Sequence, residues 1–268
     1  MKIENTQNTQ SLLQQIQEKQ TDRMRQLASG KRVERASDDA AAMQIIEQLT
    51  AESNAYQRSV GNAYDGISML QVAEGGLESV GNDVNRIREL TIQAGNGALA
   101  DSDRQALQSE IEQLRGNIDQ TLERTEFAGK PLLTSNASEE FLVGSSAGES
   151  ISVNLVDFRE QGLSALENID LTDADSRDNL LGELDNLRDT ISSQRAEFGA
   201  TQNQFESAAR NLMNTDTNMQ EARSRMQDLD YAMGTAENIQ GQIQQSAAIS
   251  VQSQANARNE QVLSVLGG

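Results

Sequence analysis

The stretch FESAARNLMNTDTNMQEARSRMQDLDYAMGTA, residues 205–236, decides the fold of this chain. Its apolar residues recur at steps of three and four, with one step of seven, at Phe205, Ala208, Leu212, Met219, Ala222, Met226, Leu229, Met233 and Ala236. A mean period of about 3.5 residues is typical of a helix that packs along another helix. We therefore expect a long coiled-coil helix, with its methionines as core residues rather than an adaptable docking surface.

Apolar residues continue toward both ends of the chain, where a globular domain would become polar. The C-terminal segment adds Ile239, Ile243, Ile249, Val251, Val262, Leu263, Val265 and Leu266, and the N-terminal segment has Leu13, Ile16, Met24 and Leu27. Such ends are expected to complete their packing inside an assembly. We assign the assembly seam to Leu13, Ile16, Leu27, Ile239, Ile243, Val262, Leu263 and Leu266.

The composition favours elongated helices over a large compact core. Aromatic residues make up 3% of the chain, Trp is absent, the mean hydropathy is -0.60, and Pro131 is the only proline. Long helices are therefore permitted on both sides of that proline. The expected fold class is mainly α, with long helices in an antiparallel coiled-coil rod and a small β-hairpin insertion.

The sequence offers little material for catalysis. It has no cysteine and no histidine, which excludes disulfides, thiol nucleophiles, and the commonest general base and transition-metal ligand. Asp38 and Asp39 are adjacent on the expected helix and point about 100° apart, so we read them as helix-start residues. The acidic pairs and clusters lack the spacing of a calcium loop. No catalytic, cofactor-binding or metal-binding residue is predicted, and the chain is not expected to be an enzyme.

Charge divides the chain into regions. The net charge is -19, but residues 1–37 contain seven Lys or Arg against four acids, and residues 232–268 contain one Arg against two acids. The acidic excess therefore lies in residues 38–231. We expect the segments 1–37 and 232–268 to form one discontinuous inner domain and 38–231 to form the rod. An acidic surface disfavours nucleic-acid binding, and neither a membrane span nor a cleaved secretory signal is expected.

Local signals divide the chain into its expected elements. A first helix should cover about 5–28 and end at Ser29-Gly30, and a second should start at a Ser37 cap and end near AGNG, residues 94–97. A Ser102/Gln105 capping box should open a third helix that ends by Phe127. Alternating residues around SSAGES predict a hairpin within about 128–172. Thr172 with Asp175 should open a final helical region that continues with few stops to the C-terminus.

Several long blocks resemble one known family. RQLASGKRVERASDDAAA (25–42), NAYDGISMLQVAEGGLESVGNDVNRIRELTIQAGNG (62–97), RAEFGATQNQFESAARNL (195–212) and QANARNEQVLSVL (254–266) are similar to bacterial flagellin. The resemblance implies a structural subunit that polymerises into the flagellar filament for motility, with paired termini lining a central channel. It also implies export without a cleaved signal and a location outside the cell in the flagellum.

The resemblance further implies partners and a second role. The partners are other copies of the chain, the filament cap, the hook-filament junction protein, and the export chaperone and export apparatus. Flagellins are also ligands of a host Toll-like innate immune receptor, and the matching positions here are Arg86, Leu90, Gln93 and Glu110, while Leu114 stands where strong agonists often have Arg. From spacing alone, Arg86 and Glu89 form only a surface ion pair.

Two other readings compete with a filament subunit. The hook-filament junction protein of the same superfamily shares the helical ends but caps a single ring. Some flagellins carry a metalloprotease in the variable region, but that reading requires H-E-x-x-H, and this chain has no histidine.

Overall fold

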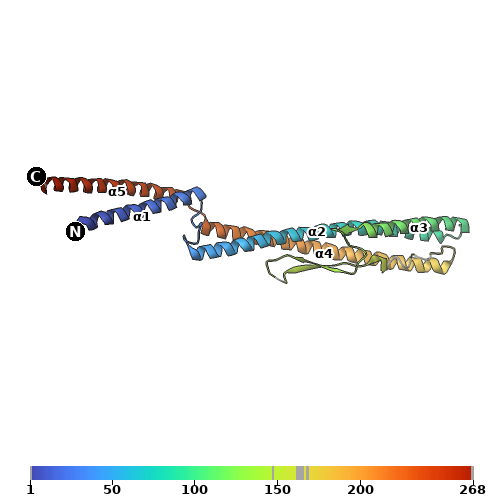
Figure 1. The fold of residues 1–268 in the computed structure, drawn as a ribbon. Helices are drawn as coiled ribbons and strands as arrows, with labels where there is room; N and C mark the ends of the chain where they lie inside the picture. The colour runs from blue at the N-terminus through green and yellow to red at the C-terminus, as the bar shows by residue number, and fades with distance from the viewer. Residues whose placement is uncertain (1, 147, 161–165, 167–168, 267–268) are drawn as a thin grey trace. The chain divides into compact units, whose positions relative to one another are not determined.

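The computed structural model describes residues 2–146, 148–160, 166 and 169–266. The chain forms two compact units (Figure 1). The terminal unit consists of residues 1–53 and 217–268, and the rod unit consists of residues 54–216. The terminal unit thus contains both end segments that the sequence predicts to pair, together with residues 38–53 and 217–231, which the sequence assigns to the rod.

Five long helices dominate the described chain, which confirms the expected fold class. They are α1 (Lys2–Ser29), α2 (Ala40–Ala94), α3 (Asp101–Arg124), α4 (Ala174–Gln227) and α5 (Tyr231–Leu266). In the rod unit α2 and α4 run antiparallel, because residues near the start of one meet residues near the end of the other. The Gln57 amide donates to Asp216 at 3.2 Å, and Arg88 pairs with Asp185 at 2.9 Å.

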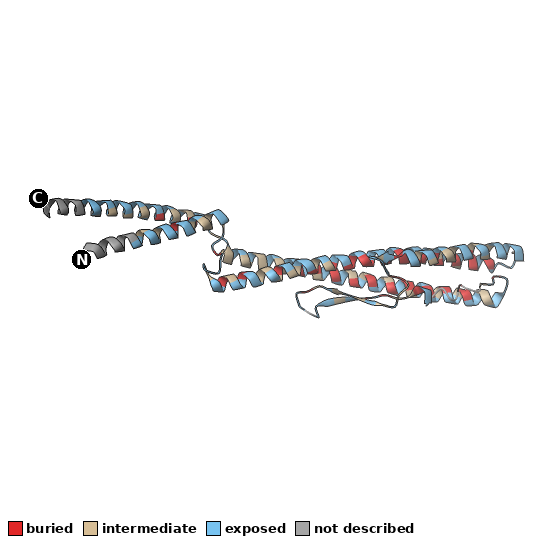
Figure 2. Ribbon diagram, viewed as in Figure 1, coloured by how far each residue is buried: buried red, intermediate tan, exposed pale blue. Residues whose placement is uncertain are grey.

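The rod unit has a continuous apolar core. The buried residues recur at steps of three and four on each helix and face inward (Figure 2), as a coiled-coil seam requires. They include Leu70, Leu77, Val84 and Leu90 of α2, Ile111, Ile118 and Leu122 of α3, and Leu184, Ile191, Phe198 and Phe205 of α4. Gly66 allows the tip of the Phe205 ring to approach α2 closely, since an added Cβ would sit 2.6 Å from Phe205 Cζ.

Two small antiparallel hairpins lie between α3 and α4. The strands β3 (Ser138–Leu142) and β4 (Ser150–Asn154) form the expected hairpin, with Phe141 opposite Ile151. Two side chains of α2 bind the hairpin to the helix. Ser59 Oγ donates to the Gly144 carbonyl at 2.7 Å, and the Asn62 amide donates to the Leu142 carbonyl at 2.9 Å. The sequence analysis missed the second hairpin, β1 (Glu126–Phe127) with β2 (Lys130–Pro131), whose turn places Ala128 and Gly129 at positive φ.

The helix starts differ from the predicted caps. Asp39 rather than Ser37 caps α2, and its carboxylate accepts the Ala42 N–H at 2.9 Å. Asp173 rather than Thr172 caps α4 through the Ser176 N–H. At the start of α3 the Asp103 carboxylate accepts the Ala100 N–H at 3.1 Å, so the predicted Ser102/Gln105 box is wrong. In each case a charged carboxylate, which interacts favourably with the helix dipole, replaces the predicted hydroxyl.

The final helical region is also interrupted where the sequence predicts continuity. Residues 228–230 separate α4 from α5, and Asp230 caps the new helix by accepting the Ala232 and Met233 N–H groups. The break is held by backbone pairing with a distant segment: the Leu229 N–H donates to the Gly30 carbonyl at 2.9 Å, and Lys31 forms an isolated bridge with Asp228.

Candidate assembly surface and receptor-binding patch

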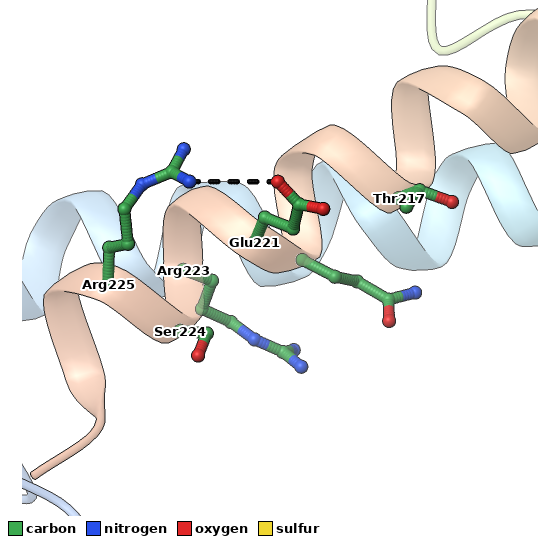
Figure 3. A pocket seen from close by; sticks show the side chains of 6 residues that line it. Thr217, Glu221, Arg223, Ser224 and Arg225 are labelled. Carbon is green, nitrogen blue, oxygen red and sulfur yellow. Dashed lines mark ion pairs between the residues drawn. The ribbon is translucent and has the colours of Figure 1, made fainter.

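One shallow pocket of about 480 Å³ is lined by Thr217, Gln220, Glu221, Arg223, Ser224 and Arg225, all from a single stretch of α4 (Figure 3). Its one ion pair joins Arg225 to Glu221 at 3.6 Å, one helical turn apart. Among the described residues, no group of three His, Cys, Asp or Glu side chains could hold a metal ion. Within the same part of the chain, no helix is long and apolar enough to cross a membrane.

The α1 side of the α1–α5 pair follows a coiled-coil seam. Leu13, Ile16, Gln20, Arg23 and Leu27 recur at steps of three and four and are all at least half-buried. Gln20 is the most buried of them, and its amide donates a short hydrogen bond to the Asn238 side chain. Arg23 donates to the Glu237 carbonyl at 2.7 Å. Both contacts join residues late in α1 to residues early in α5, so the two helices are antiparallel.

The α5 side of the same pair is built from small and polar residues. Gly234, Asn238, Gly241, Gln245, Ala248 and Gln252 also recur at steps of four and three, and they are the more buried positions of α5. Added Cβ atoms at Gly234 and Gly241 would meet Leu27 and Gln20, respectively. The absence of side chains at these glycines lets the two helix backbones approach closely, as small residues do in other close helix pairs.

The large apolar side chains of α5 are exposed rather than buried against α1. Ile239 is 57% exposed and Ile243 64% exposed, and Met233, Ile249 and Val251 are also more than half exposed. The apolar series that the sequence analysis followed through residues 205–236 therefore does not continue along α5 as its contact with α1. Of the predicted assembly residues, Leu13, Ile16 and Leu27 are half-buried against α5, while Val262, Leu263 and Leu266 lie beyond the residues whose side chains the structure describes.

A groove of about 640 Å³ runs along this helix pair. Its lining includes the apolar residues Leu12, Ile16 and Val251 and the polar residues Lys19, Gln20, Arg23 and Gln244. Leu12 and Val251 are each about half exposed. Exposed apolar side chains that lie together in a groove are typical of a protein–protein contact surface.

The predicted receptor-binding residues lie on α2 and α3 of the rod unit. Arg86 is half exposed and donates to Glu110 at 2.9 Å and to Glu89 at 3.2 Å. These two carboxylates, chiefly the hydrogen-bonded Glu110, raise the pKa of the Arg86 guanidinium. Gln93 is exposed on the same helix, and its carbonyl accepts the Asn96 N–H at 3.0 Å. Arg86, Glu89 and Glu110 thus form one exposed charged cluster.

Leu90 does not belong to that exposed surface. It is 1% exposed and is part of the rod core, so the expectation that it contacts a partner does not fit its burial. Its position explains the difference: it lies four residues after Arg86, yet the apolar seam of α2 includes Ile87 and Leu90, which both face inward. Motif matching cannot distinguish an exposed position from a seam position, whereas the 3.5-residue period can.

Family comparisons match both halves of the chain. Residues 3–138 match the family described as the bacterial flagellin N-terminal helical region, and residues 181–266 match the bacterial flagellin C-terminal helical region. The chain belongs to the bacterial flagellin family. The function implied by the sequence resemblance, a structural subunit that polymerises into the flagellar filament for motility, is therefore confirmed.

Relatives support the family assignment over nearly the whole chain. The flagellin of Bacillus subtilis is 34% identical, and the flagellin of Halalkalibacterium halodurans is 33% identical; each comparison covers 91% of this chain and at least 90% of the relative. A flagellar filament core protein of Treponema maltophilum is 29% identical over 90% of both chains. This mutual coverage and the length of 268 residues show a short form of flagellin without large outer domains.

Solved structures support the same fold. The crystal structure of Bacillus cereus flagellin aligns with a TM-score of 0.53 at 27% identity and covers 61% of this chain and 94% of that one. A hook-associated protein from Vibrio parahaemolyticus aligns with a TM-score of 0.63 at 15% identity. That second likeness shows a shared fold, and the sequence relatives favour the filament subunit over the junction protein.

Proposed function

We propose that this flagellin polymerises through the exposed apolar side chains of α5 and the exposed edge of α1. Support comes from the side chains of Ile239, Ile243, Ile249 and Val251, which are apolar and mostly exposed in the single chain. Each buried CH2 group contributes about 0.8 kcal/mol, so covering four such side chains supplies several kcal/mol per subunit. In this proposal residues 1–37 and 232–268 form the inner domain that lines the filament channel, and Val262, Leu263 and Leu266 extend the same seam.

The charge distribution agrees with that placement. The terminal segments are close to neutral, whereas residues 38–231 carry the entire acidic excess of the chain. Near-neutral segments can be packed together at high density, while like charges are better tolerated at a surface that faces water. The rod would then form the acidic outer layer of the filament.

An Ile243→Ser substitution tests the assembly surface. The side chain contacts little in the single chain, so folding of the rod unit should not change, while the critical concentration for polymerisation should rise. Gln240→Ser, at an exposed polar position one turn away, is the matched control and should polymerise normally. Unchanged polymerisation of Ile243→Ser, measured by light scattering with seeded filaments, would remove this face from the interface.

Family membership also supports specific partners and a location. We propose that the chain is exported without a cleaved signal by the flagellar export chaperone and apparatus, and that it then functions outside the cell. There it would be added beneath the filament cap and above the hook-filament junction protein. No catalytic activity is assigned to it. Deleting the chaperone gene should leave the protein inside the cell, and normal secretion in that strain would contradict this assignment.

A second role, as ligand of a host Toll-like receptor, is favoured by the exposed cluster of Arg86, Glu89 and Glu110. Arginines that donate in two directions often contribute strongly to interfaces, and Arg86 is half exposed with both partners on the surface. We propose that Arg86, Gln93 and Glu110 form the contact surface and that Leu90 supports it from the core.

Arg86→Ala separates receptor binding from folding. Exposed ion pairs contribute about 0–1 kcal/mol to stability, so the unfolding midpoint should move little while receptor signalling falls. Arg210→Ala is the matched control, because Arg210 is also exposed and pairs with Glu206 within its own helix at 3.3 Å. Equal signalling by Arg86→Ala and Arg210→Ala monomers would exclude the patch.

A further inference from the structure

We propose that the loop between α2 and α3 is a self-modification site, at which Asn96 and Gly97 react to form a cyclic imide and then aspartate or isoaspartate. Asn96 is the only asparagine in the sequence that is followed by glycine. Both residues are exposed in the loop between Ala94 and Asp101. The reaction needs the backbone nitrogen of residue 97 to attack the side-chain carbon Cγ of Asn96.

The nucleophile is accessible. Gly97 has no side chain to block approach to its nitrogen, and among the described residues none accepts a hydrogen bond from its N–H. Regular helix or sheet pairing would occupy this N–H and fix the backbone away from the side chain. The loop forms no such regular pairing at Gly97, so the N–H can lose its proton to hydroxide.

The loop also stabilises the deprotonated nucleophile. Loss of the Gly97 amide proton gives an anion whose charge is shared with the Asn96 carbonyl oxygen, because the two atoms belong to one peptide group. That oxygen already accepts two hydrogen bonds, from the Leu99 N–H at 3.1 Å and from Arg104 Nη2 at 3.3 Å. A nearby cation and hydrogen bonds to the charged form both favour that form.

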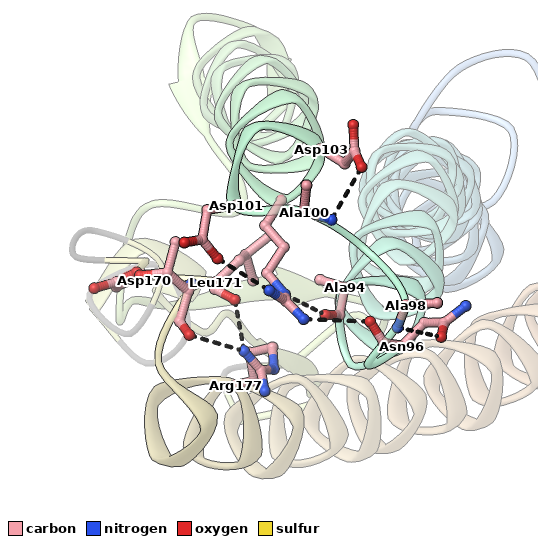
Figure 4. A network of polar contacts seen from close by, with 11 residues as sticks. Ala94, Asn96, Ala98, Ala100, Asp101, Asp103, Asp170, Leu171 and Arg177 are labelled. Atoms are coloured by element: carbon pink, nitrogen blue, oxygen red, sulfur yellow. Dashed lines mark hydrogen bonds and ion pairs between the residues drawn. The ribbon is translucent and has the colours of Figure 1, made fainter.

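The position of Arg104 is fixed by further contacts. Its side chain is 14% exposed, its Nε donates to the Ala94 carbonyl at 3.1 Å, and its Nη1 pairs with Asp101 at 3.1 Å (Figure 4). The guanidinium therefore links the C-terminal end of α2 to the first turn of α3. Since these contacts hold the group in place, its third donor is directed at the Asn96 carbonyl without further ordering.

The electrophile is polarised by a separate donor. The Ala98 N–H donates to Asn96 Oδ1 at 3.0 Å, as Figure 4 shows. Attack on Cγ places negative charge on this same oxygen, so the Ala98 N–H stabilises the tetrahedral intermediate as an oxyanion donor does. The same bond leaves the amide nitrogen Nδ2 as the departing group.

The chemistry balances with water as the only co-reactant. A bond forms between the Gly97 nitrogen and Asn96 Cγ, the bond from Cγ to Nδ2 breaks, and ammonia leaves with a proton from solvent. Water then opens the cyclic imide at either carbonyl. Opening at the former main-chain carbonyl gives isoaspartate, whose new carboxylate contains the oxygen that Arg104 contacts. Either product adds one negative charge beside the guanidinium, so the converted fraction records the time since folding.

Trypsin allows the reaction to be followed in the intact protein. Cleavage after Arg88 and Arg104 releases residues 89–104, a peptide in which Asn96 is the only asparagine. The full chain is aged in neutral and mildly alkaline buffer, then digested, and conversion is read as the mass change from amide to acid. The peptide of residues 196–210, whose only asparagine is Asn203 in α4, is the internal control. We expect conversion at Asn96, faster at higher pH, and none at Asn203.

Two variants and one comparison decide the proposal. Gly97→Ala should slow conversion at least about tenfold, which corresponds to ~1.4 kcal/mol of barrier. It should not disturb the fold, because an added Cβ meets nothing within 4 Å and the φ angle is not in the left-handed region. Arg104→Gln should slow conversion in the folded chain but not in the urea-unfolded chain. Conversion in the folded chain that is no faster than in the unfolded chain would overturn the proposal.

Discussion

The rod unit and the α1–α5 pair are both antiparallel helix pairings, yet they bury opposite kinds of residue. In the rod unit the contact positions are Leu, Ile, Val and Phe, most of them fully buried. In the α1–α5 pair the α5 contact positions are Gly234, Asn238, Gly241 and Gln245, while Ile239 and Ile243 are exposed. The rod unit buries its apolar surface within the chain, whereas the α1–α5 pair leaves large apolar side chains of α5 exposed. Under the assembly proposed above, another subunit would cover those exposed side chains.

The largest effect on stability is expected from truncating a side chain in the rod core. Ile118→Ala removes a fully buried side chain of α3 and should lower the free energy of unfolding by about 2–5 kcal/mol. Ile243→Ala removes the same atoms from an exposed position and should change it by no more than about 0.5 kcal/mol. Urea unfolding of the two variants, followed by circular dichroism, compares them directly. Similar losses would show that the Ile243 side chain is buried within its own chain.

A glycine substitution tests how tightly the rod helices pack. Gly66→Ala would place a Cβ 2.6 Å from the Phe205 ring, so it should destabilise the rod by about 1–3 kcal/mol through overpacking. Gly61→Ala has nothing within 4 Å and should stabilise α2 by up to about 1 kcal/mol through helix propensity. Thermal unfolding of both variants gives the measurement. A stabilising Gly66→Ala would mean that Phe205 is free to move away.

A smaller effect is expected from the polar contact between α1 and α5. Gln20 Oε1 is buried and has no hydrogen-bond partner among the described residues, although the Gln20 amide donates to Asn238. Replacing Gln20 and Asn238 together by Leu should stabilise the pair by about 1 kcal/mol and relax its register, because buried amides specify register at a cost in stability. Amide exchange of α1 and α5 in the monomer should slow. Gln240→Leu, on the exposed side, should not slow it.

The smallest effects concern acid. Hydrogen bonding by Arg88 lowers the pKa of Asp185 in the rod, and the backbone N–H groups of Arg35 and Glu34 lower the pKa of Asp38 in the terminal unit. Since both folded pKa values lie below the unfolded value of about 3.9, the stabilisation is complete above that pH and is lost as pH falls through the folded pKa. Asp185→Asn should flatten the acid dependence of rod unfolding, and Asp38→Asn should leave it unchanged. A rod transition equally acid-sensitive in both variants would assign the effect to other carboxylates.

The sequence predicted the helices and the main hairpin because periodicity reports local burial. It did not predict the break at residues 228–230, which depends on backbone pairing with Gly30 and Lys31 almost two hundred residues away. It assigned the apolar residues of α5 to an assembly seam, but it did not predict that glycine and amide residues on another face of α5 make the contact with α1. A hydrophobic pattern identifies a buried surface but not which molecule buries it. The helix caps were placed one or two residues away because Asp, Ser and Thr compete for the same role in sequence.

The pairing of α2 with α4 also has a kinetic consequence. The hydrogen bond between Gln57 and Asp216 joins residues 159 apart in sequence, and the one between Glu74 and Gln202 joins residues 128 apart. Before such contacts can form, a long loop must close, and the contacts offset the entropic cost of that closure only afterwards. Folding is therefore expected to be slow for a helical protein. In the export route proposed above, a chain that leaves with its N-terminus first would have no partner for α2 until α4 follows. The same would hold in the opposite direction, so the rod would remain unpaired during most of its export, whichever end leads.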